Sequence, residues 1–164
     1  MIARIDNRAT HGILEKGIGI LKRLMHRGAA GGDPNTGDGA GLLFRLPDKF
    51  FRAQMRRQKV VLPPIGRYAV ATLFGGEEKE SLIESCFVSE GLSILGWREV
   101  PVCADAIGET ARSTLPRIRQ LFIGAGSIEE QDAFERKLFV ARRQIEKKVS
   151  GVYIPSCSSR TIVY

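Results

Sequence analysis

The stretch HRGAAGGDPNTGDGAG, residues 26–41, separates a helix-like segment from a strand-like one in this chain of 164 residues. It holds six glycines, two aspartates and a Pro-Asn pair, whereas a plain connection between elements takes about 4–6 residues. Glycine tolerates positive φ, and aspartate and asparagine make local turns. We therefore predict a loop that bends repeatedly, with several glycines at positive φ, and that lies beside a functional site.

Glycine-rich loops serve several chemistries, and the flanking elements exclude two of them. A dinucleotide-binding loop follows a strand and opens a helix, but this loop follows a helical pattern and precedes a strand. A P-loop ends in Gly-Lys-Ser/Thr, and this one ends in Gly-Ala-Gly. Asp33 and Asp38 do not have EF-hand spacing, so we expect no metal. A tightly packed hairpin that contributes no chemistry stays open as an alternative.

The composition is that of an ordinary globular domain, with 43% hydrophobic and 26% charged residues. Because no apolar run approaches about 20 residues and no secretory signal is visible, we expect a cytoplasmic protein with no membrane partner. Three cysteines, Cys86, Cys103 and Cys157, are too few and too far apart for a disulfide framework or a CxxC metal site. The net charge of +7 is spread over several predicted helices, so we expect no nucleic-acid partner.

Hydrophobic periodicity predicts a mixed succession of helices and strands without an internal repeat. The predicted strands are 2–6, 41–46, 67–74, 97–102, 117–124, 152–158 and 160–164. The predicted helices are 10–25, 48–58, 77–95, 107–113 and 134–145. This succession predicts an α+β fold in one domain or part of one.

Four separated blocks carry a resemblance to a known family. They are ATHGILEKGIGILKRLMHRGAAGGDPNTGDGAGLLFRLPDKFF (9–51), GLSILGWREVPV (91–102), FERKLFVARRQIEK (134–147) and SSRTIVY (158–164). Together they resemble the glutaminase domain of glutamate synthase large subunits, a class II glutamine amidotransferase and N-terminal nucleophile hydrolase. The His26-Arg27-Gly28 element and the run from Gly37 to Gly41 are the most specific parts.

The resemblance implies a four-layer αββα sandwich and a defined reaction. In the family, an N-terminal cysteine attacks the side-chain amide of glutamine, and its own α-amine acts as the base. The released ammonia reaches a portion of the synthase that carries FMN and an iron–sulfur cluster and reductively aminates 2-oxoglutarate. The resemblance therefore implies glutamine as substrate, the remaining synthase domains or subunits as partners, and no cofactor within the glutaminase domain.

The sequence departs from the family pattern at both ends. Family members begin with a Cys-Gly-x-Gly strand just ahead of the segment that matches IARID (2–6). Their oxyanion-hole Asn-Gly pair, and the Arg and Asp that hold the substrate, follow the SSRTIVY block. We therefore expect residues 1–164 to be a partial class II amidotransferase domain that is inactive as given. The alternative is a non-catalytic paralogue that acts as an interaction or regulatory module.

No catalytic residue of the family can be carried onto this chain, but the resemblance places five residues around the pocket. They are Arg27, Gly28, Asp38, Gly39 and Gly41. Arg27 lies near the nucleophile in the family, although His26 and Arg27 could instead cap the preceding helix, where cations are favoured. We expect Asp38 to tie the loop together by accepting backbone hydrogen bonds, and we expect the glycines to permit close packing.

Overall fold

The computed structural model describes residues 2–3, 5–6, 8–24, 28, 33, 35–37 and 39–164. The chain divides into two compact units. Unit 1 is Met1–Arg45, Val102–Leu115 and Tyr164, and unit 2 is Leu46–Pro101 and Pro116–Val163. None of the helices in these described ranges is both long enough and apolar enough to cross a membrane.

Each unit mixes helix and strand. Unit 1 contains α1 (His11–Arg23), β1 (Leu43–Arg45), the 3-10 helix η3 (Ala104–Ala106) and α4 (Glu109–Ser113). The helices of unit 2 are α2 (Asp48–Arg57), the 3-10 helix η2 (Glu77–Lys79), α3 (Glu80–Val88) and α5 (Gln131–Lys148). Its strands are β2 (Tyr68–Gly75), β3 (Ser93–Glu99), β4 (Ile118–Gly124), β5 (Val152–Ser158) and β6 (Thr161–Val163). The mixed helix and sheet agree with the α+β class predicted above.

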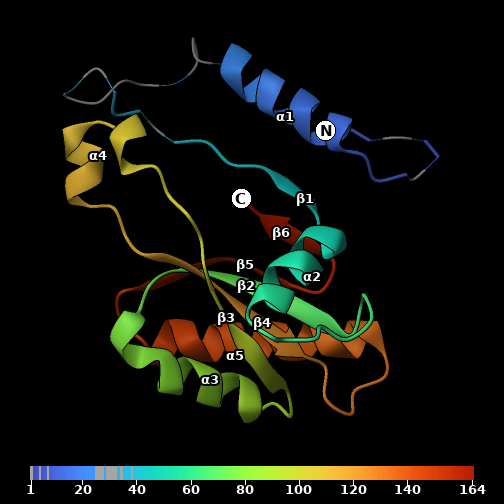
Figure 1. The fold of residues 1–164 in the computed structure, drawn as a ribbon. Helices are drawn as coiled ribbons and strands as arrows, with labels where there is room; N and C mark the ends of the chain where they lie inside the picture. Colours follow the sequence, from blue (N-terminus) through green and yellow to red (C-terminus); the bar gives the residue numbers. More distant parts are fainter. Residues whose placement is uncertain are drawn as a thin grey trace. The chain divides into compact units, whose positions relative to one another are not determined.

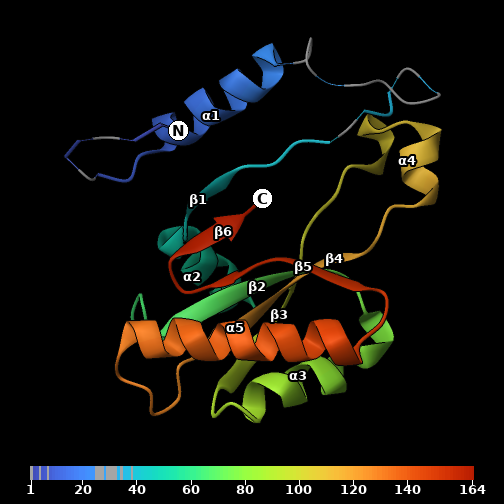
Figure 2. The ribbon, with the colours of Figure 1, turned by 180° about the vertical axis from the view of Figure 1, so that it is seen from behind.

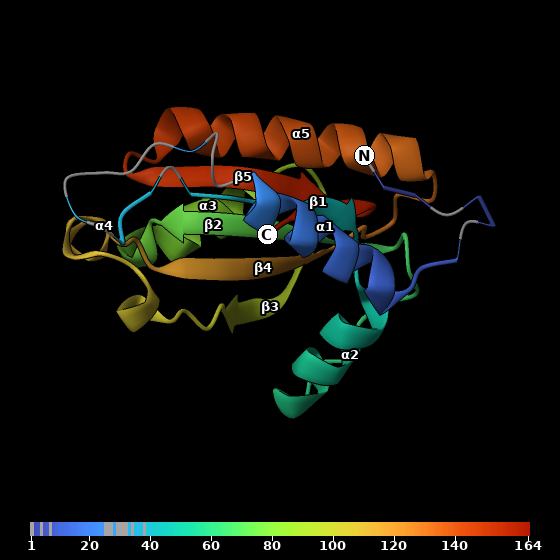
Figure 3. The ribbon, with the colours of Figure 1, turned by 90° about the horizontal axis from the view of Figure 1, so that it is seen from above.

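The centre of unit 2 is an antiparallel sheet in the order β3-β4-β2-β5, with the four strands side by side (Figure 3). In β2, Ala71 lies opposite Leu121 of β4, and Val70 lies opposite Phe122. Because successive side chains of a strand point to opposite faces, these two pairs belong to different faces. The sheet is therefore buried on both faces at its centre.

Helices α3 and α5 cover one face of this sheet, and α2 and β6 lie on the other (Figures 1 and 2). The α5 residues Phe134, Leu138, Ala141 and Ile145 are at most 1% exposed and recur at the spacing of a single helix face. They pack against a core cluster that includes residues of β2, β4 and α3. On the opposite face, the ring of Phe51 from α2 meets that of Phe122 edge-on at 5.2 Å.

In unit 1, the amphipathic helix predicted from the sequence is less buried than its pattern suggests. The helix expected at 10–25 is present as α1, with Thr10 in the N-cap position, but none of its described residues is buried. Leu42, just before β1, exchanges two backbone hydrogen bonds with Tyr164, at 2.8 and 2.9 Å.

The strand expected at 2–6 is wrong for the described residues 2, 3, 5 and 6, which form no strand. The Asp6 carboxylate accepts a hydrogen bond from the backbone N–H of Arg8 at 3.2 Å. Such local side-chain bonds give the backbone an alternative to a ladder. A strand needs a neighbouring strand to pair with, and alternation of apolar and polar residues alone does not supply one.

The helix expected at 77–95 is also too long. The helix α3 ends at Val88, and Gly91 follows it at φ 80°, a conformation that suits glycine and ends the helix. Ile94, which we placed on the helix, instead pairs with Ile123 in the sheet. The strand β3 thus begins earlier than predicted and ends at Glu99 rather than at residue 102, close to Pro101, whose missing N–H cannot continue a ladder.

Candidate functional site

The structure describes three of the five residues expected around the pocket, namely Gly28, Gly39 and Gly41. Arg27 and Asp38 lie outside the described residues. Gly28 and Gly41 are exposed. Gly39 has φ 79°, as expected for a glycine of this loop. The expectation that several of the loop glycines have positive φ stays a prediction.

A different aspartate ties the described part of the loop together. The Asp33 carboxylate accepts hydrogen bonds from the backbone N–H of Asn35 at 3.2 Å and from the Thr36 hydroxyl at 2.7 Å. It also accepts one from the backbone N–H of Thr110, in the first turn of α4, at 3.2 Å. All four residues belong to unit 1. Asp33 therefore joins the turn at 33–36 to a segment that is 77 residues away in sequence.

A backbone hydrogen bond of Gly108 adds to this junction, which we call the Asp33 clasp (Asp33, Asn35, Thr36, Gly108 and Thr110). The backbone N–H of Gly108 donates to the carbonyl of Asn35 at 2.9 Å. A Cβ on Gly108 would lie 1.8 Å from Oδ1 of Asp33 and 2.2 Å from the Thr36 hydroxyl oxygen. The two segments can approach this closely because residue 108 has no side chain.

The clasp stabilises the ionised form of its carboxylate. Hydrogen bonds from the side chain of Thr36 and from Thr110 lower the pKa of Asp33 from 3.8 to about 2. A carboxylate that accepts several hydrogen bonds holds its charge more strongly than a solvated one. Asp33 is therefore an anion at neutral pH, and its hydrogen bonds are directed to the loop and to α4.

From the sequence, Asp33 is considered only as a possible metal ligand, and the tying role is expected for Asp38. One sequence signal was available: Asp-Pro-Asn-Thr at 33–36 is typical of a turn closed by an aspartate side chain. Its partners on α4 gave no signal, because no motif connects Gly108 and Thr110 to the loop. The tying role expected for Asp38 itself stays a prediction.

A second group of polar side chains crosses the sheet of unit 2 on the face opposite α3 and α5. Arg98, Gln120, Thr72 and Ser156 occupy paired positions on β3, β4, β2 and β5. Arg98 donates to Oε1 of Gln120 at 2.8 Å, and the Ser156 hydroxyl donates to that of Thr72 at 3.4 Å. All four are at most 7% exposed. The row contains no cysteine or histidine, so it offers no nucleophile–base pair of the Cys–His kind.

The three cysteines have different surroundings. Cys86 is buried on α3, as its position on the apolar helix face predicted, whereas Cys103 is exposed and Cys157 is partly buried on β5. Burial raises the pKa of the Cys157 thiol to about 12, so little of the reactive thiolate exists at neutral pH. Of the histidines, His11 lies 3.8 Å from the Glu15 carboxylate on the exposed surface of α1.

The described residues do not form a metal site, since no group of three histidine, cysteine or acidic side chains among them could hold an ion. The three cysteines belong to α3, the segment before η3, and β5.

The densest basic cluster, in α2 and just after it, is partly used within the fold. Arg52 bonds the Asp48 carboxylate at 3.0 Å and donates to the carbonyls of Leu62 and Pro63 at 2.7 and 2.5 Å. Asp48 in turn accepts the hydroxyl of Tyr68 at 2.9 Å. These bonds attach α2 to the segment that leads into β2, so Arg52 has a structural partner of its own.

Comparison with known proteins assigns the same family to the whole chain. Residues 1–164 match the family described as "Glutamine amidotransferases class-II". The chain is similar to the glutamate synthase [NADPH] large chain of Bacillus subtilis, with 41% identity over 100% of this chain and 11% of that protein.

Two other relatives show the same partial coverage. The glutamate synthase [NADPH] large chain of Azospirillum brasilense is 38% identical over 99% of this chain and 12% of its own length. The ferredoxin-dependent glutamate synthase 1 of Arabidopsis thaliana is 36% identical over 99% of this chain and 11% of its own length. The chain thus spans about a ninth of these relatives.

Proposed function

Because the chain belongs to the class II glutamine amidotransferases, we propose that it forms part of the glutaminase region of a glutamate synthase. This region would release ammonia from glutamine for the reductive amination of 2-oxoglutarate elsewhere in the synthase. The observation that carries the proposal is the extent of the similarity. All 164 residues match the family, and the relatives at 36–41% identity are glutamate synthases with different electron donors in their names.

The proposal includes the family's four-layer αββα sandwich. The β3-β4-β2-β5 sheet would be one of its two sheets, and α3 and α5 its outer helical layer. Two features of unit 2 support this assignment. The long helix α5 and the helix α3 both lie on one face of the sheet (Figures 1 and 2). The opposite face, where α2 contributes Phe51, carries buried residues such as Phe122 and Gln120, as a face packed against another layer would.

Within this function, we assign the loop a framing role. The groups of the Asp33 clasp are bonded to one another: the carboxylate accepts from a hydroxyl and from two backbone N–H groups. These bonds direct the Asp33 carboxylate and the Thr36 hydroxyl toward the clasp itself. The clasp would therefore hold the shape of the wall of a glutamine pocket, and chemistry would come from groups other than those in the clasp.

The polypeptide of 164 residues should not hydrolyse glutamine by itself. Its cysteines lie at 86, 103 and 157, whereas the resemblance places the attacking cysteine in a strand ahead of the segment that matches IARID. It also lacks the Asn-Gly pair and the substrate-holding Arg and Asp that the resemblance places after the SSRTIVY block. Loss of an oxyanion-hole donor alone costs about 10²–10³ in rate.

A glutaminase assay on three polypeptides tests the proposal. They are the 164 residues, the same residues preceded by a Cys-Gly-x-Gly strand, and the same residues with both flanks of the family domain. We expect ammonia release from the third only, because the second still lacks the oxyanion and substrate-holding residues. Ammonia release from the first would overturn the assignment of the site. A folded but inactive third polypeptide would favour a non-catalytic paralogue with an interaction or regulatory role.

A further inference from the structure

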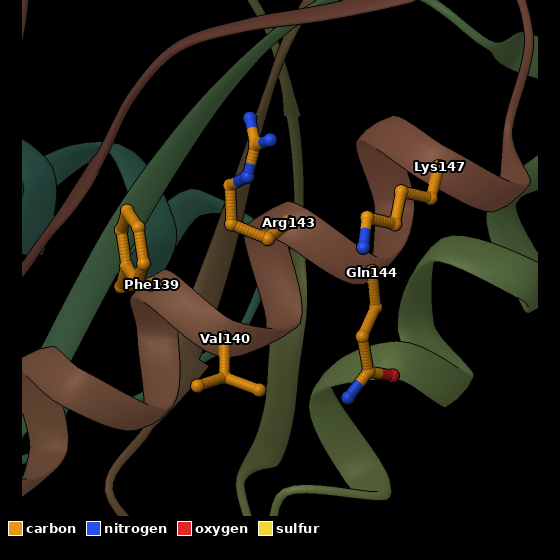
Figure 4. A pocket seen from close by; sticks show the side chains of 5 residues that line it. All are labelled: Phe139, Val140, Arg143, Gln144 and Lys147. Atoms are coloured by element: carbon orange, nitrogen blue, oxygen red, sulfur yellow. The ribbon is translucent and has the colours of Figure 1, made fainter.

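The helix α5 has an apolar surface on its outer side in addition to its buried face. Phe139 is 60% exposed and Val140 is 41% exposed, although neighbouring positions of the helix are charged. With Arg143, Gln144 and Lys147 they line a hollow of about 230 Å³. Figure 4 shows these five side chains projecting from successive turns of the helix. We call this surface the α5 outer face.

The rim of the α5 outer face is positively charged. Residues 142–148 contain four cations and one carboxylate, that of Glu146. Glu146 is shared, since it accepts from Nε of Arg142 at 2.8 Å and also pairs with Arg143. In the part of the chain that the structure describes, no carboxylate lies within 4.0 Å of the Lys147 ammonium. The rim therefore has positive charge to offer to a partner.

We propose that the α5 outer face is the surface on which the rest of a glutamate synthase large chain docks, an inference that rests on the proposed function. The matched region is only 11–12% of the relatives' length, so under the proposed function a much larger part of the synthase lies outside these residues and is available to contact them. Contacts between domains bury about 600–1,500 Å² and are more polar than obligate interfaces. An apolar centre with a charged rim has this character.

The positive charge of the rim favours a partner surface of a particular kind. A cationic rim is complemented by an acidic surface around an apolar projection that fills the hollow beside Phe139. A second copy of the chain fits less well, because two copies of the face would bring Arg143 and Lys147 of each copy together. A nucleic acid is also disfavoured, since Glu146 lies within the rim and Phe139 is the only aromatic side chain lining the hollow.

The test measures maleimide labelling of an introduced cysteine in the complete polypeptide that the gene encodes. Val140→Cys probes the face, and Val61→Cys is the control, because Val61 is 85% exposed in the segment after α2. Both are made in a Cys103→Ser background, since Cys103 is exposed. Labelled peptides are identified by mass spectrometry. The difference in exposure accounts for about a twofold difference in rate, and docking should slow labelling at residue 140 at least tenfold relative to residue 61.

A charge reversal provides the second measurement. Lys147→Glu should raise the labelling rate of the Val140→Cys variant several-fold and leave the Val61→Cys variant unchanged. Labelling at residue 140 within twofold of residue 61 would overturn the proposal, whether or not the polypeptide continues past Tyr164. Protection that appears only in a dimer of this chain would also overturn it. Buried Cys86 must stay unlabelled, which shows that the variants are folded.

Glutamine hydrolysis by the same polypeptide separates this inference from the proposed function. An inactive polypeptide with residue 140 protected would reject the glutaminase assignment and leave the docking surface intact. An active polypeptide with residue 140 freely labelled would reject the docking surface alone.

Discussion

A Cβ on Gly108 would lie 1.8 Å from Oδ1 of Asp33, so these two residues, far apart in sequence, can be neighbours only while residue 108 is glycine. The same approach lets the N–H of Gly108 reach the Asn35 carbonyl at 2.9 Å. The described part of the glycine-rich loop is therefore held from outside the loop, by the segment that begins α4.

Substitution of Gly108 by alanine should release this contact. The new methyl group would collide with the end of a flexible side chain, so the Asp33 carboxylate would move away and lose its bond to Thr110. We expect a loss of at most about 1 kcal/mol in global stability, at the low end for overpacking, together with faster hydrogen exchange at the Thr110 amide.

Gly19→Ala in α1 is the matched control, because a Cβ there meets nothing within 4 Å. Alanine in a helix interior is favoured over glycine by about 1 kcal/mol, so this variant should be at least as stable as the parent. Unchanged exchange at Thr110 in the Gly108→Ala variant would show that the clasp does not depend on the glycine.

The Asp33 clasp should also respond to pH. The folded pKa of Asp33 is about 2, below its ordinary value of 3.8, so the clasp favours the ionised form. Its stabilising contribution is fully present above about pH 4 and is lost as the pH falls towards 2. Carbon NMR of the Asp33 carboxyl group should give a midpoint near 2, and Thr36→Val should raise it, because the Thr36 hydroxyl is the largest cause of the shift. A midpoint near 3.8 in the parent would contradict the clasp.

The strongest periodic segments were predictable from sequence. The strand β4 and the helix α5 lie where the patterns placed them, because the α5 residues Phe134, Leu138 and Ile145 satisfy helix geometry and core packing at once. The weaker sequence patterns gave wrong predictions where contacts with residues outside the segment determine whether it forms a helix or a strand. Ile94 has helical spacing to the residues before it, but Gly91 ends the helix and Ile123 supplies a strand to pair with.

The candidate site was less predictable than the fold for a related reason. Local chemistry marked the turn at 33–36, since aspartate and threonine at that spacing can bond each other. The tying role of Asp33 depends in part on Thr110, which no local pattern connects to it. The polar row through Gln120 was also hidden, because its members lie on four strands and meet only through the strand register.

The buried cation on β4 gives a third stability prediction. Arg119 is 1% exposed, stacks 4.6 Å from the centre of the Trp97 ring and pairs with Glu80 of α3. Among the described residues, nothing accepts from its Nε and Nη2 groups. Glu80→Gln should therefore destabilise the fold by about 1 kcal/mol, at the low end for a lost bond to a buried charge, since Glu80 is partly exposed.

Adding Arg119→Met to Glu80→Gln should recover that loss, because replacing a buried ion pair with apolar groups is often neutral or stabilising. Urea unfolding of the two single variants and the double variant measures this. A double variant less stable than Glu80→Gln alone would show that Arg119 contributes more through Trp97 than through its charge partner.

The turn between β5 and β6 depends on Glu135 of α5. Its Oε1 atom accepts from the backbone N–H and the hydroxyl of Ser159 at 2.7 and 2.6 Å, and Ser159 is only 2% exposed. Glu135→Ala would leave that N–H without an acceptor, at a cost of about 1–3 kcal/mol. Glu135→Gln keeps an acceptor oxygen and should lose clearly less.

Glu130→Ala is the control, because Glu130 is the N-cap residue of the same helix and its side chain makes no capping hydrogen bond. Glu130 pairs with Arg136 at 3.3 Å, and both side chains are more than 60% exposed, so its loss should cost less than about 1 kcal/mol. Denaturant midpoints should therefore fall in the order parent, Glu130→Ala, Glu135→Ala, with Glu135→Gln above Glu135→Ala. Equal losses for the two Glu135 variants would mean that the carboxylate charge, rather than its role as an acceptor for Ser159, fixes the turn that leads into β6.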